Sequence, residues 1–251
     1  MDLTVFFKEQ EVDIFAEVGL DNLSDEDRSS VVQFFPAARS VIVFGKEVPV
    51  PVYRMPAKEK TRGMLRIAET LDNTAVGLAG LLETEQIPAK PVPLYLPVRF
   101  ADGRVQGVVR LKQVAAAGGL GTLGRNTVLL TPRFGPRLLL SGVVSGRWVS
   151  GEADNRAGRG EAPACTGCGR CIKVCPAGAV GPEGVDTFRC RTVSAWVPPH
   201  LVPFAKWMLG RTIVLKCVAP LAPWIAWKAT IRCSLCVTEC PHYPGDGCQE
   251  P

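Results

Sequence analysis

The chain has 251 residues, which is enough for one large domain or two modest ones with a buried core. Hydrophobic residues make up 47% of it and charged residues 21%, which excludes a disordered protein. The net charge of +5 is mildly basic and is weak evidence for an anionic partner. The N-terminus has no basic leader, no twin arginine and no long apolar segment, so we expect a cytoplasmic protein.

The N-terminal residues predict a mixture of helices and strands. Residues 3–8 are expected to form a helix, and residues 12–20 alternate well enough for a strand or a short helix. Ser24, with Asp27 three residues later, predicts the N-cap of a helix that runs to Phe35. The many acidic residues of this part are interpreted mainly as a solvated face.

The following elements predict a strand covered by a long helix. The apolar run at residues 40–45 is typical of a buried strand, and the proline-rich residues 48–56 are expected to form a loop. Between residues 58 and 85, apolar residues recur at every third and fourth position, which predicts an amphipathic helix packed on a sheet. Residues 92–100 return to strand-like composition, interrupted by two prolines.

A glycine-rich stretch at residues 118–126 matches the Gly-x-Gly-x-x-Gly pattern of dinucleotide-binding sites. That fingerprint needs a strand before the glycines and a helix after them, whereas residues 112–117 look helical and residues 127–130 look like a strand. We therefore interpret the stretch as a tight turn in which glycine permits a positive φ or close approach to a ligand. Residues 127–130 and 137–144 are expected to pair as a hairpin around the turn at residues 131–136.

All ten cysteines fall between Cys165 and Cys248, and none precedes Cys165. An extracellular disulfide framework usually belongs to a shorter chain, so we expect these thiols to serve a metal in a reducing compartment. The polar, glycine-rich residues 151–163 are expected to form a linker. This linker would separate an N-terminal cofactor- or substrate-binding domain, residues 1–150, from a cysteine-rich domain, residues 164–251.

The first cysteine run contains four thiols, separated by two, two and three residues, and ends in Cys-Pro. This is the bacterial ferredoxin pattern, in which the first three thiolates bind one [4Fe–4S] cluster and the fourth binds another. A structural zinc site is the alternative, but it needs only two pairs of cysteines. The run consists of Cys165, Cys168, Cys171 and Cys175, followed by Pro176.

A second run repeats this pattern without its first thiol, because Thr230 stands at that position. Exchanging one cysteine between the runs supplies four ligands to one cluster and three to the other, and Cys190, which lies between the runs, supplies the eighth. The two sets are then Cys165, Cys168, Cys171 and Cys240, and Cys233, Cys236, Cys175 and Cys190. Cys217 competes with Cys190 for the last position. Cys190 is preferred, because Cys217 lies in an apolar stretch where a buried free cysteine is ordinary.

Residues 196–227 carry four of the five tryptophans, with basic residues between them. The uncharged run at residues 217–227 is too short to cross a bilayer, so no transmembrane segment is expected. We interpret the segment as core or cluster cover, with a partner surface and peripheral membrane contact as alternatives. Neither His200 nor His242 is assigned as a metal ligand, and Cys248 is interpreted as spare.

Several stretches in combination resemble the epoxyqueuosine reductase family, which is related to the reductive dehalogenases. They are residues 36–45, residues 115–126, residues 129–135 and the two cysteine runs. The resemblance implies an α+β fold, in which an N-terminal α/β domain of nitroreductase type precedes a bacterial ferredoxin-like domain with two [4Fe–4S] clusters. It implies the same crossed ligation and makes cobalamin a further candidate cofactor. The residues expected near the cofactor pocket are Gly119, Gly121, Gly124 and Asn126.

Members of that family reduce the epoxide of a modified base in tRNA. Their Arg-Asp-Tyr-His signature, whose Asp donates a proton, is absent from residues 57–63, where Glu59 would be a displaced acid. No catalytic residue is therefore assigned. The sequence also lacks the C-terminal helical repeats that help to grip tRNA, so it resembles a short member, and this argues against tRNA as a partner.

Three functions are consistent with these patterns. The first is an iron–sulfur protein that transfers single electrons from a ferredoxin- or flavodoxin-type donor to a cofactor or substrate held by the N-terminal domain. The second is a cobalamin-dependent reductase of an epoxide or halide, with a small molecule or corrinoid as its partner. The third is a non-enzymatic redox sensor or a protein that binds an anion or nucleic acid. Its basic residues would be Arg104, Arg110, Lys112, Arg125, Arg133 and Arg137. The first two are preferred, and both are oxidoreductases.

Overall fold

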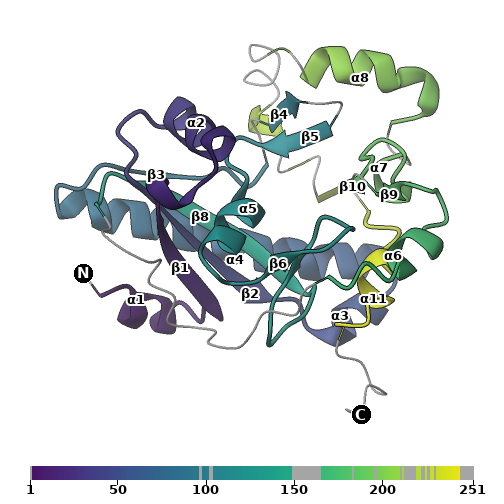
Figure 1. The fold of residues 1–251 in the computed structure, drawn as a ribbon, viewed down its shortest axis with the longest axis horizontal. Coiled ribbons are helices and arrows are strands. Elements are labelled where there is room, and N and C mark those ends of the chain that lie inside the picture. Colours follow the sequence, from purple (N-terminus) through teal and green to yellow (C-terminus); the bar gives the residue numbers. More distant parts are fainter. Residues whose placement is uncertain are drawn as a thin grey trace.

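The structure, a computed structural model, describes residues 2–95, 98–101, 104–148, 165–182, 184–194, 197–209, 211, 219–221, 224, 227–228 and 230–243 (Figure 1). Its N-terminal part is organised around a four-stranded antiparallel sheet with the order β1-β2-β8-β3. The expected mixture of helices and strands is confirmed. The strands of this sheet are β1 (Ile14–Gly19), β2 (Ser40–Glu47), β8 (Leu138–Ser145) and β3 (Ala89–Pro91).

Helices cover both faces of the sheet, so alternate residues of each strand enter different hydrophobic clusters. On β2, Val41 and Val43 belong to one cluster, whereas Ile42 and Phe44 belong to the other. All four side chains have an exposure of 0%. A strand that is enclosed on both faces has a continuous apolar sequence rather than an alternating one. The buried strand predicted at residues 40–45 is therefore confirmed.

One face of the sheet carries α1 (Leu3–Glu9) and the 28-residue helix α4 (Ala57–Thr84). Leu71, Leu78 and Leu82 of α4 pack into this cluster and are almost completely buried. The long helix predicted from its apolar periodicity is confirmed, with bounds one residue earlier at each end. The helix begins beside the cysteine-rich part of the chain, so it links the sheet to that part (Figure 1).

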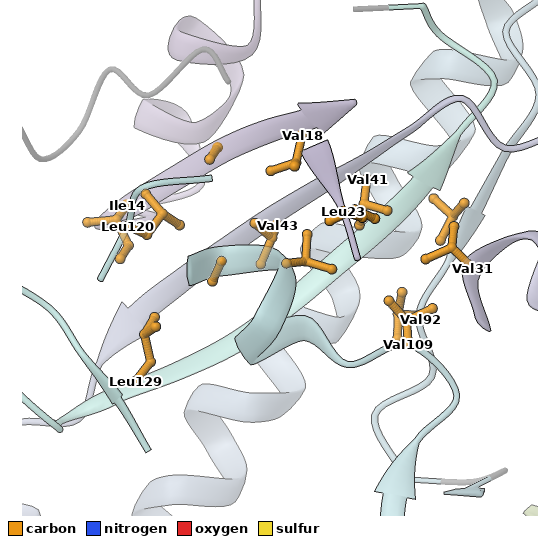
Figure 2. Packing of buried hydrophobic residues seen from close by; sticks show 14 of the residues in the cluster. Ile14, Val18, Leu23, Val31, Val41, Val43, Val92, Val109, Leu120 and Leu129 are labelled. Carbon is orange, nitrogen blue, oxygen red and sulfur yellow. The ribbon is translucent and has the colours of Figure 1, made fainter. Parts of the chain in front are cut away.

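The opposite face is covered by α2 (Asp25–Phe34) and α5 (Leu111–Ala117), whose apolar residues pack with the sheet (Figure 2). Ser24 caps α2 as predicted, because its Oγ accepts a hydrogen bond of 3.2 Å from the backbone N–H of Asp27. The prediction of a solvated acidic face is wrong for Asp27 and Glu17, which are 6% and 3% exposed. Each is paired with an arginine, Asp27 with Arg110 and Glu17 with Arg147.

Two other local predictions differ from the structure. Within the expected loop at residues 48–56, α3 (Val50–Arg54) forms, because Pro51 lies in the first helical turn, where its missing N–H costs nothing. Of the strand-like residues 92–100 that the structure describes, residues 98–100 form a strand, as the beginning of β4 (Val98–Ala101), and β3 ends before them at Pro91.

The hairpin expected around residues 131–136 forms only at its turn, where Thr131 and Gly135 make an isolated antiparallel bridge. β8 pairs with β2 along its length and with β3 at residues 143–145, and no pairing of β7 (Leu129–Leu130) with β8 occurs among the described residues. β7 pairs instead with β6 (Thr122–Leu123), across the glycine-rich turn.

The remaining elements are short, and most of them belong to the cysteine-rich part. They are η1 (Leu20–Asn22), β5 (Arg104–Gly107), α6 (Arg170–Lys173), β9 (Val180–Gly181), β10 (Gly184–Val185), α7 (Arg191–Ser194), η2 (Pro199–Leu201), α8 (Val202–Leu209), η3 (Ala219–Leu221) and α11 (Leu235–Thr238). The linker expected at residues 151–163 lies outside the described residues, so the domain boundaries stay a prediction. Within the described parts, no helix is long and apolar enough to cross a membrane.

Candidate metal centre

The first cysteine run folds as a tight loop that leads into α6. Gly167 and Gly169 have φ values of 69° and 72°, in the left-handed region that glycine adopts without steric cost. These two turns allow the backbone to present several thiols from one short segment. The loop carries Cys165, Cys168 and Cys171.

Cys175 lies beyond this loop in a different backbone environment. Its Sγ accepts a hydrogen bond of 3.2 Å from the backbone N–H of Ala179. Burial opposes ionisation of the Cys175 thiol, but hydrogen bonds from the backbone of four nearby residues outweigh it and lower the pKa. These residues are Ala179, Ala177, Val180 and Gly178. The thiolate is the form of cysteine that binds metal, so this environment favours the ligating state.

The second cysteine run surrounds α11, which packs against α6 (Figure 1). Three thiols of the first run and one of the second line a common small cavity; they are Cys165, Cys168, Cys171 and Cys240. Burial raises the pKa of Cys240, and the neighbouring Cys168 and Cys171 raise it further. Two segments separated by more than sixty positions in the sequence thus contribute thiols to one place.

The other thiols gather around Cys236. Burial raises the pKa of Cys236 to about 11, with further contributions from nearby thiols, mainly Cys233, Cys190 and Cys175. The segment after Cys190 also contacts the second run, because Thr192 Oγ1 donates a hydrogen bond of 3.5 Å to the Cys233 carbonyl oxygen. Cys217, the alternative to Cys190, lies outside the described residues, as does Cys248.

These two neighbourhoods contain the same residues as the two predicted ligand sets, although iron binding itself stays a prediction. In the described part of the chain, no group of three or more Cys, His, Asp or Glu side chains is arranged to hold a single metal ion. The four ligands of a [4Fe–4S] cluster bind four different irons, so they need not converge on one point as zinc ligands do. The donor set is chemically suited to iron–sulfur clusters, because it consists of soft sulfur ligands.

The glycine-rich stretch contacts the second cysteine run through Asn126. Its Nδ2 donates a hydrogen bond of 2.7 Å to the Cys236 carbonyl oxygen, and its Oδ1 accepts one of 3.3 Å from the backbone N–H of Val128. Asn126 and Gly124 both line the small cavity that contains the four thiols. The stretch therefore joins the N-terminal sheet to the thiols.

The other two glycines predicted near a cofactor have a role in the turn itself. Gly119 has a φ of 73°, which permits the turn after α5. A Cβ at Gly121 would lie 2.3 Å from the Leu130 carbonyl oxygen, so only glycine allows β6 to approach β7 there. Neither residue lines either of the two cavities described for the site. The helix before the glycines and the strand after them agree with the prediction of a turn rather than a dinucleotide fingerprint.

A larger cavity, of about 770 Å³, lies between the N-terminal part and the cysteine-rich part. Its walls come from α5, the glycine-rich stretch, the start of β8 and the segment that contains Cys190. Lys112 lies on this wall, and its Nζ donates a hydrogen bond of 2.8 Å to the Thr127 carbonyl oxygen. Desolvation lowers the pKa of Lys112, and the proximity of Cys236 opposes this effect. The cavity is thus close to one thiol set and large enough for a small molecule or part of a cofactor.

Several basic residues proposed as an anion-binding surface have other partners. Arg110 pairs with Glu26 and Asp27 at 2.8 and 2.6 Å. Arg137 pairs with Glu47 and donates a hydrogen bond of 3.2 Å to the Val48 carbonyl oxygen. These contacts assign both arginines a structural role within the N-terminal part.

Two residues at the beginning of α4, which the sequence analysis did not identify, hold the second cysteine run. Lys60 Nζ donates a hydrogen bond of 3.2 Å to Ser234 Oγ. Thr61 Oγ1 accepts one of 2.7 Å from the backbone N–H of Ile231. No local signal marks these residues, because they belong to the polar positions of an amphipathic helix and their partners are far away in the sequence.

Comparison with known proteins gives related sequences and structures. No protein-family model matches the chain. The chain is 28% identical over 198 residues to the epoxyqueuosine reductase of Listeria monocytogenes, a match that covers 73% of this chain and 48% of that protein. It is 26% identical over 222 residues to the epoxyqueuosine reductase of Synechocystis sp., covering 87% of this chain and 68% of that protein. The chain thus spans about half the length of the first of these relatives.

Solved structures of epoxyqueuosine reductases have the same fold. The enzyme from Streptococcus thermophilus matches with a TM-score of 0.60 at 16% identity, covering 100% of this chain and 68% of that chain. An epoxyqueuosine reductase with a tRNA-Tyr epoxyqueuosine-modified stem loop matches with a TM-score of 0.50 at 16% identity, covering 79% and 59%. The chain is similar in sequence and in fold to epoxyqueuosine reductases. The resemblance identified from the sequence motifs is therefore confirmed.

Glu59, which would be the displaced acid relative to the epoxyqueuosine reductase signature, lies outside both cavities. Glu59 lies in the first turn of α4 and is exposed. Its neighbour Lys60 is buried instead. The catalytic acid therefore stays unassigned in this chain.

One part of the tryptophan-rich segment contacts α4, and another part is exposed to solvent. Trp227 Nε1 donates a hydrogen bond of 2.7 Å to Glu69 Oε1, which also accepts one of 3.3 Å from the Tyr95 hydroxyl. Phe204 and Trp207 on α8 stack on each other and are 60% and 51% exposed. The expectation of core or cover thus fits only part of this segment, and Trp196 lies outside the described residues.

Proposed function

We propose that this chain is an iron–sulfur oxidoreductase that carries two [4Fe–4S] clusters and acts on a small molecule or cofactor in the large cavity. One observation carries the proposal: thiols from two distant cysteine runs line a common cavity, as the crossed ligation requires. The proposed ligands are Cys165, Cys168, Cys171 and Cys240 for the first cluster, and Cys175, Cys190, Cys233 and Cys236 for the second. The relationship to the epoxyqueuosine reductases supports the reductive class of reaction.

When bound, such clusters would accept and donate single electrons, supplied by a ferredoxin- or flavodoxin-type donor. The role of the chain is to hold the reacting groups close together and to control their charge. Cys190 lies on the wall of the large cavity, so the second cluster would be the one next to the substrate. Asn126 and Thr61 hold the second run against the N-terminal part, so a cluster bound there would be held beside the cavity.

The experiment is anaerobic reconstitution followed by determination of iron and acid-labile sulfide. We expect about eight irons per chain and two EPR signals after reduction with dithionite. Cys175→Ser and Cys240→Ser should each alter a different signal, whereas the spare Cys248→Ser should alter neither and serves as the matched control. Cys217→Ser distinguishes the two candidates for the eighth ligand, because only loss of a true ligand changes the second signal.

A result of about four irons or fewer would contradict the two-cluster proposal. Retention of both unperturbed signals in Cys175→Ser and in Cys240→Ser would contradict the crossed ligation. An altered signal in Cys217→Ser with an unaltered signal in Cys190→Ser would show that Cys217, and not Cys190, is the eighth ligand.

A second candidate function is a cobalamin-dependent reductase of an epoxide or halide. It is supported by the cavity of about 770 Å³ beside the proposed second cluster, with polar residues of α5 on one wall and leucines of β8 on another. Arg125 and Gln113 could bind the polar groups of a corrinoid, and Leu138 and Leu140 could pack on its apolar surface. Titration of reconstituted protein with cob(II)alamin should change its absorption and EPR spectra, and an unchanged spectrum would contradict this function.

The same preparation can test tRNA as a partner. The name of one matched structure includes an epoxyqueuosine-modified tRNA stem loop, and that ligand belongs to that protein. We expect weak binding of such a stem loop to this chain, because two arginines of the expected basic surface are occupied by carboxylates. Tight binding that weakens steeply with salt would show that tRNA is a partner.

A further inference from the structure

Lys60 is a buried cation beside the second cysteine run. Only 7% of the residue is exposed, and its Nζ donates a hydrogen bond of 3.2 Å to Ser234 Oγ, next to Cys233. Across the described residues, no carboxylate lies within ion-pair distance of this ammonium. Its recorded hydrogen-bonding partner is a neutral hydroxyl.

An ammonium buried in this way needs a counter-charge. Removing a charged group from water is unfavourable unless an opposite charge or several hydrogen bonds compensate for it. One hydroxyl supplies neither a charge nor a complete set of acceptors for the three donors of a lysine. The structure therefore contains a positive charge that the described protein groups do not balance.

The nearest candidate for this counter-charge is the proposed second cluster. Four thiolate ligands outweigh the positive charge of the iron–sulfur core, so such a cluster is an anion that gains one further negative charge on reduction. Ser234, which binds Lys60, is adjacent to the ligand Cys233 and two residues before the ligand Cys236. The ammonium thus lies beside the backbone that would surround the anion.

The beginning of α4 is also held against the second cysteine run by the residue after Lys60. Thr61, the next residue of α4, is 3% exposed, and its Oγ1 accepts a hydrogen bond of 2.7 Å from Ile231 N–H. The helix therefore contacts the second run on both sides of Cys233, at Ile231 and at Ser234. A charge held in a low-dielectric interior acts more strongly on its neighbours than the same charge in water.

We infer that Lys60 is the counter-ion of the second cluster and raises its reduction potential. The inference rests on the proposed function, because it requires the second cluster to be present. A fixed positive charge favours the reduced cluster, which carries one negative charge more than the oxidised cluster. Lys60 lines neither of the two cavities described for the site and its hydrogen bond goes to Ser234 Oγ, so its role is one of electrostatic positioning.

The test is a redox titration of reconstituted protein, monitored by EPR, in which dithionite supplies one electron to each cluster. Lys60→Met removes the charge and keeps a chain of similar length. Lys60→Arg keeps the charge. Lys58→Met is the matched control, because Lys58 is an exposed lysine in the same turn of α4. The signal that Cys233→Ser alters is assigned to the second cluster.

We expect Lys60→Met to disfavour reduction of the second cluster about tenfold, which is a shift of about 59 mV to lower potential for a one-electron couple. The first cluster should keep its potential, and Lys60→Arg and Lys58→Met should both behave like the unaltered protein. Failure of Lys60→Met to assemble the second cluster, with normal assembly in Lys60→Arg, would also support a requirement for the charge.

Two results would overturn the inference while leaving the proposed function intact. The first is an unchanged potential in Lys60→Met that retains about eight irons. The second is loss of the second cluster in both Lys60→Met and Lys60→Arg, each with a normal circular dichroism spectrum, because shape rather than charge would then be required. Absence of iron–sulfur clusters from the unaltered protein would instead contradict the proposed function.

Discussion

Asn126→Ala should weaken the attachment of the second cysteine run to the N-terminal part. The Asn126 side chain is 5% exposed and makes two hydrogen bonds, one of 2.7 Å to the Cys236 carbonyl oxygen and one of 3.3 Å from Val128 N–H. Each neutral hydrogen bond contributes about 0.5–1.5 kcal/mol net, so the loss of both predicts a decrease of about 1–3 kcal/mol in the free energy of unfolding. The upper end applies if the Cys236 carbonyl stays buried without a partner.

The assay is anaerobic thermal unfolding of reconstituted protein at a fixed scan rate. For a chain of this size, 1 kcal/mol corresponds to about 2–4 °C, so the transition should fall by about 2–12 °C. Asn73→Ala is the matched control, since Asn73 is an exposed residue on α4 and its replacement should change the transition little. A second readout is the rate at which a chelator removes iron, which should increase only in Asn126→Ala.

The reasoning would be refuted if Asn126→Ala and Asn73→Ala had the same transition temperature and the same rate of iron loss. Such a result would mean that water or a local shift replaces both hydrogen bonds of Asn126. A lower transition temperature without faster iron loss would restrict the role of Asn126 to the stability of the turn.

Two further predictions concern charges and protonation. Arg110→Met should decrease the free energy of unfolding by about 3 kcal/mol, because it removes the arginine that pairs with the buried carboxylate of Asp27. Urea unfolding tests this, with Lys46→Met as the control: Lys46 belongs to an exposed ion pair, so its replacement should change the free energy of unfolding by less than about 1 kcal/mol. Equal effects of the two substitutions would contradict the prediction. Burial and the nearby Glu69 raise the pKa of Tyr95 from 10.0 to about 12, so its contribution to stability is complete below pH 10 and is lost as the pH rises toward 12. Urea unfolding at several pH values should therefore show a weaker loss over this window in Tyr95→Phe, and identical pH profiles would exclude this role.

Local patterns determined a large part of the N-terminal fold. The periodicity that predicts α4 and the continuous apolar run that predicts β2 both depend on residues close in sequence, and both elements form as expected. The cap at Ser24 is likewise a local interaction, between a hydroxyl and an N–H three residues later. Such elements can be predicted from the sequence because all of the interacting residues lie within or next to the helix or strand itself.

Strand pairing could not be predicted in the same way. Residues 127–130 and 137–144 look like a hairpin from their composition, yet only the bridge between Thr131 and Gly135 forms at the turn, while β7 pairs with β6 and β8 pairs with β2 and β3. The partner of a strand depends on which distant segment buries the most apolar surface, and this information is absent from the strand's own residues. For the same reason, the acidic N-terminal part did not reveal that two of its carboxylates are buried against arginines.

For the candidate metal centre, the sequence by itself determined the chemistry, because the spacing of the cysteines specifies how many thiols each loop can present and of what kind. The tertiary structure decided which thiols from the two runs share a cavity and which groups of the N-terminal part surround them. Lys60 and Asn126 reach the second run only because the sheet, α4 and the glycine-rich turn bring distant residues together. Local spacing sets the available ligands, whereas the charge and packing around them arise from contacts between segments that are far apart in the chain.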